Sequence, residues 1–234
     1  MTLGVRHAAG QETMTLRGSQ PQPVQIFGTT NTGIKVQLGA ATMVEPFANV
    51  VAVTMPAPPE FTAAETAYEH NDLPSALRNA TSVVSNFRGL PTDWAREAML
   101  MLGDIDVSMG QLPQARAAYQ DYQRMYPTAG SADLNVGLAR IDVANKDYTA
   151  AKAKIDPILA DALKKRNLPT QTAALIGRAF FVSGEIKQAT GDLQGALVDY
   201  LRTVTIFPQD RVAVVNAEQH ADALRKEHDG LAVP

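Results

Sequence analysis

Cysteine is absent from the 234 residues. This excludes disulfides, thiolate catalysis and cysteine-ligated zinc, and it fits either redox compartment. No segment approaches the roughly 18 consecutive apolar residues of a transmembrane helix, so we expect no membrane insertion. The net charge of −3 gives no basic field for nucleic acid or anionic lipid. The first residues, MTLGVRHAAGQE, lack the apolar centre of a signal peptide. A mature exported domain would look the same, so the compartment stays open between cytoplasm and cell envelope.

Recognisable catalytic motifs are also missing. No two histidines stand four residues apart, as they would in a His-Glu-x-x-His zinc motif, and no G-x-S-x-G nucleophile elbow is present. Asp104 and Asp106 are two residues apart on an expected helix, so they face different directions and do not form a catalytic carboxylate pair. We therefore expect a non-enzymatic protein with no cofactor, no metal and solvent-facing histidines. These histidines are His7, His70, His220 and His228.

The segment GTTNTGIK, residues 28–35, is close to the phosphate-binding pattern G-x-x-x-x-G-K-[ST]. However, Ile34 separates the second glycine from Lys35, and no Ser or Thr follows to hold magnesium. The flanking residues alternate between apolar and polar, which is a strand period and leaves no helix to receive a phosphate. The segment therefore predicts a β-hairpin, with Asn31 or Gly33 providing the positive φ of its turn.

The composition changes near residue 56. The first 55 residues are poor in charge and rich in Thr, Val and Gly, and residues 56–60 form a proline-rich linker. From residue 61 to 234 the periodicity is helical. Short strands are expected at 13–17, 23–28, 33–38, 41–45 and 50–54, with a weaker one at 3–7. The segment GIKVQLGAATMVEPFANVVAVTM resembles SH3-like small β-barrels in pattern alone, without ligand residues. Because so small a unit buries little surface, we expect it to pack against the first helices.

The helical segment repeats itself four times. Each unit has a turn, then a small residue five positions after the first turn residue, and in three units a larger residue four positions further on. The turns begin at Asn71, Gly110, Lys146 and Gly191, the small residues are Ala76, Ala115, Ala151 and Ala196, and the residues after them are Ala80, Tyr119, Ile155 and Tyr200. Pro127 and Pro208 close two of the units. This pattern resembles the tetratricopeptide repeat family, although each unit is longer than that family's 34 residues.

The resemblance implies a mostly α-helical, right-handed solenoid of about four helix pairs after the small β unit. The alanines would allow close helix contacts, and the larger residues would fill the space beside them. Residues 212–227 place Ala213, Val214, Ala217, Ala221 and Leu224 on one helix face, which predicts a capping helix at the end of the stack. Trp94, the single tryptophan, is expected to be a packing residue at a helix start.

A solenoid has a concave groove lined by the first helix of each pair. Projecting the groove positions of the family onto this chain gives Phe61, Glu65, Tyr68, Glu97, Leu100, Asp104, Val107, Asp133, Val136, Arg140, Arg178, Phe181 and Glu185. Family members that clamp the carboxylate tail of chaperones use Lys, Asn and Arg at several of these places, whereas here they are mostly acidic or apolar. We therefore expect a scaffold or adaptor that binds a basic or amphipathic protein segment, with bacterial envelope assembly as one setting. The alternative is an accessory module whose β unit recognises a ligand while the helices support it.

Overall fold

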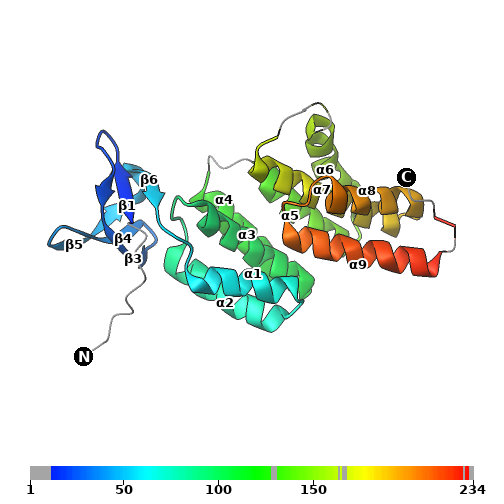
Figure 1. The fold of residues 1–234 in the computed structure, drawn as a ribbon, viewed down its shortest axis with the longest axis horizontal. Coiled ribbons are helices and arrows are strands. Elements are labelled where there is room, and N and C mark those ends of the chain that lie inside the picture. The colour runs from blue at the N-terminus through cyan, green and yellow to red at the C-terminus, as the bar shows by residue number, and fades with distance from the viewer. Residues whose placement is uncertain (1–11, 128–130, 163, 165–167, 229, 232–234) are drawn as a thin grey trace.

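The computed structural model describes residues 12–127, 131–162, 164, 168–228 and 230–231. Within these residues the chain is mostly helical, with two small antiparallel sheets at its N-terminal end (Figure 1). The strands are β1 (Thr13–Leu16), β2 (Gln22–Pro23), β3 (Gln25–Thr29), β4 (Gly33–Leu38), β5 (Ala41–Pro46) and β6 (Val50–Thr54), with a 3-10 turn η1 (Phe47–Asn49) before β6. The helices are α1 (Pro59–Glu69), α2 (Leu73–Phe87), α3 (Asp93–Ser108), α4 (Leu112–Met125), α5 (Ser131–Ala144), α6 (Tyr148–Ala162), α7 (Thr170–Ala189), α8 (Leu193–Thr205) and α9 (Arg211–Glu227). None of the helices described is both long and apolar enough to cross a membrane.

The β unit consists of two three-stranded sheets, ordered β2-β1-β6 and β3-β4-β5. In the part of the chain described, neither sheet closes into the barrel that the SH3-like resemblance implied. Five of the expected strands are present, with 23–28 divided between β2 and β3, and the weak strand at 3–7 lies outside the described residues. Ile34 and Val36 are completely buried, and their cluster includes Leu90 and Ala95 from the helical part.

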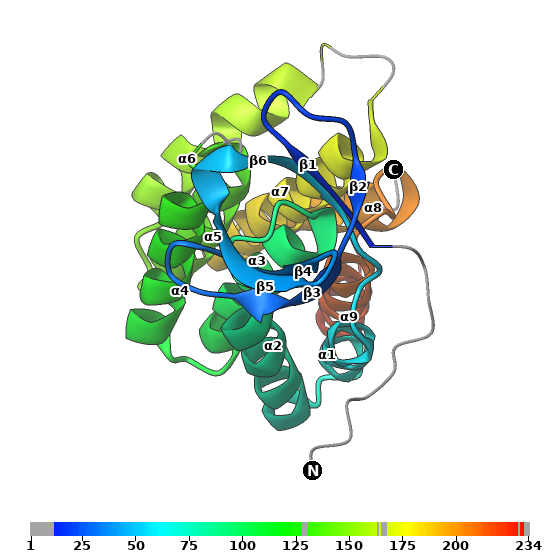
Figure 2. The ribbon, with the colours of Figure 1, turned by 90° about the vertical axis from the view of Figure 1, so that its left-hand side faces the viewer.

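The β unit therefore shares its core with α2 and α3, against which it lies in Figure 2. Trp94 is the packing residue that was expected: its ring contacts Phe61 and Phe87, and its Nε1–H donates to the carbonyl of Met55 at 2.9 Å. Thr29 also donates its hydroxyl to the carbonyl of Asn86. These contacts fix the sheet to the first helices, as a small unit with little core of its own requires.

The segment GTTNTGIK forms the expected hairpin between β3 and β4. The turn was predicted to have a positive φ at Asn31 or Gly33. This prediction is wrong, because neither residue has one. Instead, the Thr30 hydroxyl lies 3.1 Å from the backbone nitrogen of Gly33 and 3.2 Å from its carbonyl oxygen. A Cβ at Gly33 would lie 2.3 Å from the carbonyl oxygen of Glu45. Glycine is therefore required here for the close approach of β5.

The helices pack as consecutive pairs, and the first helices of successive pairs also contact one another. The four repeated alanines are completely buried, as are Tyr119 and Tyr200. All four turns begin with a residue of positive φ, including the non-glycines Asn71 and Lys146. A Cβ added at Gly103 or Gly184 would lie 2.4 Å from the ring of Tyr119 or Tyr200, respectively. Each tyrosine therefore occupies space that the glycine on the neighbouring helix leaves free.

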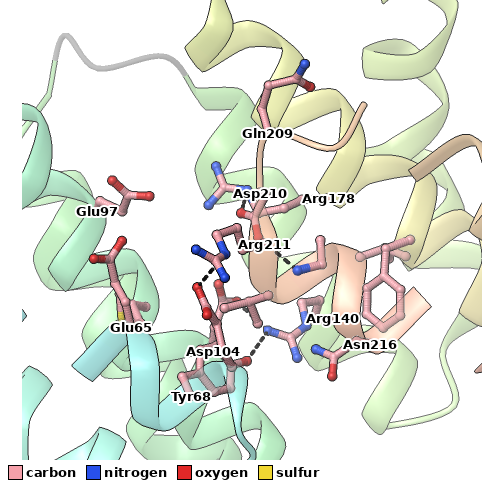
Figure 3. A pocket seen from close by; sticks show the side chains of 16 residues that line it. Glu65, Tyr68, Glu97, Asp104, Arg140, Arg178, Gln209, Asp210, Arg211 and Asn216 are labelled. Atoms are coloured by element: carbon pink, nitrogen blue, oxygen red, sulfur yellow. Dashed lines mark hydrogen bonds and ion pairs between the residues drawn. The ribbon is translucent and has the colours of Figure 1, made fainter. Parts of the chain in front are cut away.

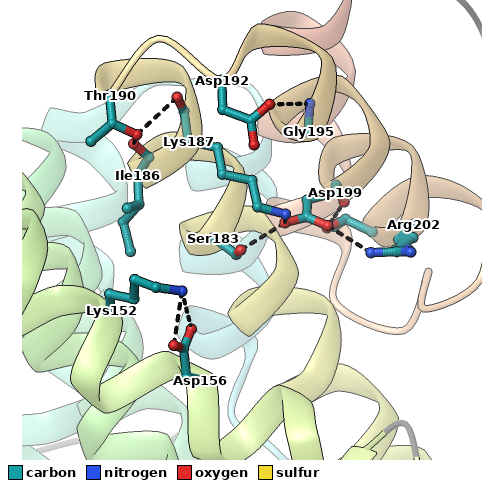
Figure 4. Close-up of polar contacts among 11 residues, drawn as sticks. Lys152, Asp156, Ser183, Ile186, Lys187, Thr190, Asp192, Gly195, Asp199 and Arg202 are labelled. Carbon is teal, nitrogen blue, oxygen red and sulfur yellow. Dashed lines mark hydrogen bonds and ion pairs between the residues drawn. The ribbon is translucent and has the colours of Figure 1, made fainter.

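The buried carboxylate of Asp199 links helices α7 and α8. The carboxylate of Asp199 on α8 is 1% exposed and accepts hydrogen bonds from Ser183 at 2.6 Å, Lys187 at 2.5 Å and Arg202 at 2.9 Å (Figure 4). Two cations and a hydroxyl thus compensate for the water that this carboxylate loses. The neighbouring Lys152 is paired with Asp156 of its own helix. This cluster is explained by the packing of α7 on α8.

Helix α9 has the expected buried face, with Ala213, Ala217, Ala221 and Leu224 inside and Val214 half-buried. Its first turn, however, does more than cap the last pair, because it also contacts α1. Arg211 Nε lies 3.2 Å from Glu69 Oε1, and Val212 packs against the cluster formed by the first three helices. The end of the helical part therefore lies against its beginning (Figure 1).

Candidate functional site

The return of α9 encloses a pocket of about 150 Å³ between α1, α3, α5, α7 and the start of α9 (Figure 3). We call it the acidic pocket. It is lined by Glu65, Tyr68, Glu69, Glu97, Met101, Asp104, Arg140, Arg178, Phe181, Val182, Gln209, Asp210, Arg211, Val212, Ala213 and Asn216. Its charged lining comprises five carboxylates and three guanidinium groups. The important question is which of these charges already have partners.

The pair Asp104–Arg140 lies at one side of the pocket and is fully engaged. Asp104 Oδ1 accepts hydrogen bonds from Arg140 Nη1 and from the hydroxyl of Tyr119, both at 2.6 Å. Arg140 also contacts the hydroxyls of Tyr68 and Ser108, at 3.4 and 3.3 Å. Burial lowers the pKa of Arg140, but the neighbouring oxygens of Tyr68 and Asp104, with those of Tyr119 and Glu185, raise it well above its usual value. This network holds α1, α3, α4 and α5 together.

The other two arginines are paired as well. Arg178 on α7 forms ion pairs with Asp133 of α5 and with Asp210, whose Oδ2 is 3.5 Å from the Arg178 Nε. Asp210 is also the N-cap of α9 and accepts the backbone N–H of Ala213 at 2.9 Å. Arg211 is paired with Glu69, as described above. All three arginines of the pocket therefore form ion pairs that link the helices around it.

Glu65 and Glu97 remain without a cation partner among the described residues, and Figure 3 shows their carboxylates on the same side of the pocket. Neither side chain has a hydrogen bond or an ion pair in this part of the chain. The pKa of Glu65 is raised to about 7, mainly by burial and also by the charges of Glu97 and Glu69, with Arg211 opposing the rise. A carboxylate near a second carboxylate without a counter-ion is an unfavourable arrangement, and a cation would relieve it.

The structure brings seven of the thirteen projected groove residues into this pocket: Glu65, Tyr68, Glu97, Asp104, Arg140, Arg178 and Phe181. Phe61, Leu100 and Val136 instead belong to the buried clusters between helices, and Val107 packs against one of them. Asp133 supports Arg178 from outside the lining. Glu185 lies near Arg140, and burial raises its pKa to about 7, with Arg140 opposing and Asp104 adding to the shift. These six residues contribute packing or charge, but they do not line the pocket.

The sequence pattern did not predict that residues between 209 and 216 line the pocket. A helix with one apolar face predicts burial, which was correct, but it does not say which partner the ends of the helix reach. One signal was available: Asp210 and Arg211 place opposite charges directly at the helix start. Two opposite charges at a helix start can form ion pairs with a surface that carries both signs. Here Asp210 pairs with Arg178, and Arg211 pairs with Glu69.

The expectation of solvent-facing histidines is right for His70 and His228, which are exposed, and wrong for His220. The His220 ring packs against Phe181 and Tyr200, and its Nδ1 lies 3.1 Å from Gln188 Oε1. Burial lowers its pKa. His7 lies outside the described residues. His220 therefore supports Phe181, one wall of the acidic pocket.

Comparison of the chain with protein-family models, with characterised proteins and with solved structures finds no match. Within the residues described, no three His, Asp or Glu side chains are grouped so as to hold a metal ion.

Proposed function

We propose that this chain is a non-enzymatic interaction scaffold, in which tetratricopeptide-like helices bind a basic segment of a partner protein. The observation that carries the proposal is that Glu65 and Glu97, both in the acidic pocket, have no direct ion-pair or hydrogen-bond partner among the described residues. A lysine or arginine side chain of the partner would supply the missing positive charge. Because burial weakens competition from water, such a contact is worth more here than on an open surface.

The size of the pocket limits which ligands can enter it. Its volume of about 150 Å³ is similar to cavities that hold one benzene-sized molecule, whereas pockets for drug-sized ligands measure roughly 300–1,000 Å³. One long side chain fits, and a whole helix does not. Phe181 and Val182 line the same space and would contact the methylene groups of such a side chain. The rest of the partner segment would lie across the mouth of the pocket.

The test uses an acetylated and amidated hexapeptide that alternates Lys and Leu, with the full-length chain and fluorescence anisotropy. We expect Glu65→Gln combined with Glu97→Gln to weaken binding by about tenfold, the equivalent of roughly 1.4 kcal/mol. Binding should also weaken with added salt, since exposed charges are screened over about 8 Å at physiological ionic strength. The matched control is Glu218→Gln, an exposed position on α9, which should leave affinity unchanged.

Asp104 is unsuitable for this test, although it lines the pocket. Its carboxylate is occupied by Arg140 and Tyr119, so replacement by Lys would leave a buried cation unpaired and destabilise the fold. Glu65 and Glu97 are free of this problem. If the Lys/Leu peptide binds equally well to the Gln variant, or if a Gln/Leu peptide binds equally well to the original chain, the proposal is wrong.

The alternative proposal, ligand recognition by the β unit, draws on a different observation. Phe27, Met43 and Val44 are 49%, 43% and 46% exposed on β3 and β5, and β5 is an edge strand. An exposed apolar edge is suited to pairing with an added strand. Val44→Lys would block that pairing while leaving the acidic pocket intact, so the two proposals are separable in one binding assay.

A further inference from the structure

A second cavity, of about 980 Å³, lies where the β unit meets α3 and the end of α4. We call it the basic cleft. Its lining includes Phe47, Val51, Arg88, Arg96, Arg124 and Met125. It shares no residue with the acidic pocket, and its volume falls in the range of ligand-binding clefts.

The charged residues that line this cleft within the described part of the chain are three arginines, Arg88, Arg96 and Arg124. Arg88 and Arg124 share a single carboxylate, Asp121, which stands behind the lining. Arg96 is paired with Asp93 of its own helix turn. Two guanidinium groups on one carboxylate leave a positive charge uncompensated. Arg124 is 69% exposed, so its donors remain accessible.

The guanidinium of Arg88 is held but not saturated. Its Nη2 lies 3.3 Å from Asp121 Oδ1 and 3.8 Å from Met125 Sδ. Within the described residues, its Nη1 has no acceptor, although an arginine carries five N–H donors in all. A planar guanidinium that is held by one partner still has free N–H donors. It can bind a carboxylate through two parallel hydrogen bonds.

Apolar side chains lie beside these arginines. Val51 is 59% exposed, and Phe47 and Met125 line the cleft with it. Gly89, with φ of 79°, allows them to approach: a Cβ there would lie 2.3 Å from Met125 Cε and 3.0 Å from Phe47 Cζ. The cleft therefore combines an apolar surface with a cationic one.

We propose that the basic cleft binds an extended acidic segment of a partner protein. A glutamate or aspartate of that segment contacts Arg88 and Arg124, and a neighbouring apolar side chain packs on Val51 and Met125. Charge complementarity argues for this occupant. A nucleic-acid strand fits less well, because it needs aromatic platforms for successive bases. Of the two aromatic rings in the lining, Tyr126 is already faced by the Arg96 guanidinium at 6.0 Å, which leaves Phe47.

The probe is an acetylated and amidated hexapeptide that alternates Glu and Leu, added to the full-length chain. Two readouts are used: fluorescence anisotropy for affinity, and the methyl signal of Met125 in carbon-detected methionine NMR for location. We expect the Met125 signal to shift on binding, and Arg124→Gln to weaken affinity about fivefold, as for the loss of one partly exposed ion pair. Arg116→Gln, at an exposed position on the same helix, is the matched control and should change affinity less than twofold.

Several results would overturn this inference. One is a Met125 signal that does not move at millimolar peptide, and another is equal affinity for a Gln/Leu peptide. Equal losses with Arg124→Gln and Arg116→Gln would show non-specific attraction instead of a site. Tighter binding of a single-stranded oligonucleotide through the same arginines would assign the cleft to nucleic acid. Because the acidic pocket is tested with a Lys/Leu peptide and Glu variants, failure of either proposal leaves the other unaffected.

Discussion

Stability should fall as the pH rises from 5 to 8, because two carboxyl groups are held where their ionised forms are disfavoured. Burial raises the pKa of Glu65 and of Glu185 from 4.5 to about 7. Between these values the folded state binds more protons than the unfolded state. Stability then decreases with increasing pH, since its slope follows the difference in bound protons between the unfolded and folded states. The contribution is fully present below pH 4.5 and is lost as the pH rises through 7.

The magnitude follows from the size of the shift. One pKa unit corresponds to about 1.36 kcal/mol, so raising the pKa from 4.5 to about 7 sets an upper limit of roughly 3.4 kcal/mol for each group. Both side chains are half-buried, and solvent reduces the effect. We therefore expect about 1–2 kcal/mol each. His220 opposes this trend, because burial lowers its pKa and the folded state loses stability as the pH falls below its unfolded value of 6.5.

Comparing variants cancels the effect of His220. In urea titrations, Glu65→Gln combined with Glu185→Gln should be more stable than the original chain by about 2–4 kcal/mol at pH 8. The two proteins should have nearly equal stability at about pH 3.5, where the carboxyl groups are protonated in both the folded and the unfolded state. Glu218→Gln serves as the exposed control and should stay within about 0.5 kcal/mol at both values. Parallel stability curves for the original chain and the double variant would refute the reasoning.

Three further predictions concern packing and the hairpin. Ala115→Leu and Ala196→Leu should each destabilise the fold by about 1–3 kcal/mol in thermal melts, because both alanines are completely buried at helix contacts; unchanged melting would show that the repeat register is wrong. Gly184→Ala should cost a similar amount, since its Cβ would lie 2.4 Å from the Tyr200 ring, and part of that cost should disappear in a Tyr200→Leu background, as a double-mutant cycle would measure. Lys35→Ala should alter unfolding free energy by less than about 0.5 kcal/mol, because the side chain is exposed; saturable ATP binding abolished by this variant would contradict the hairpin interpretation.

The elements that the sequence predicted correctly are those with local causes. The four turns between paired helices begin with residues that accept positive φ, two of them glycines, and the repeated alanines follow at a fixed distance. Alternating apolar residues likewise predicted the strands of the β unit. These signals lie within a few residues of the structure that they determine. The turn at Thr30 was misjudged because a threonine hydroxyl replaced the positive φ that glycine or asparagine usually provides.

The groove was harder to predict because it depends on how each helix is rotated. Leu100 and Val136 were projected onto the groove from the family pattern, but both are almost completely buried between helices. Apolar side chains gain free energy from leaving water, roughly 25 cal/mol for each Å² buried. Burial between helices is therefore favoured over exposure in a groove for these two side chains. Glu97 and Asp104 lie one turn before and one turn after Leu100 on the same face of α3, and their side chains still line the pocket.

The closure by α9 also explains why the acidic pocket keeps its excess charge. Helix α9 brings one cation, Arg211, and one anion, Asp210, so its arrival does not change the net charge of the walls. Arg211 forms an ion pair with Glu69, and Asp210 forms one with Arg178. Arg211 therefore offsets the charge of Glu65 only in part, and burial together with the neighbouring carboxylates still raises the pKa of Glu65 to about 7. The same electrostatic penalty then has two consequences: it lowers stability at neutral pH, and it favours a cation in the pocket. A Glu65→Gln variant must consequently gain stability at pH 8 and lose affinity for a lysine-containing peptide. If only one of these changes occurs, the charge of Glu65 is not the common cause.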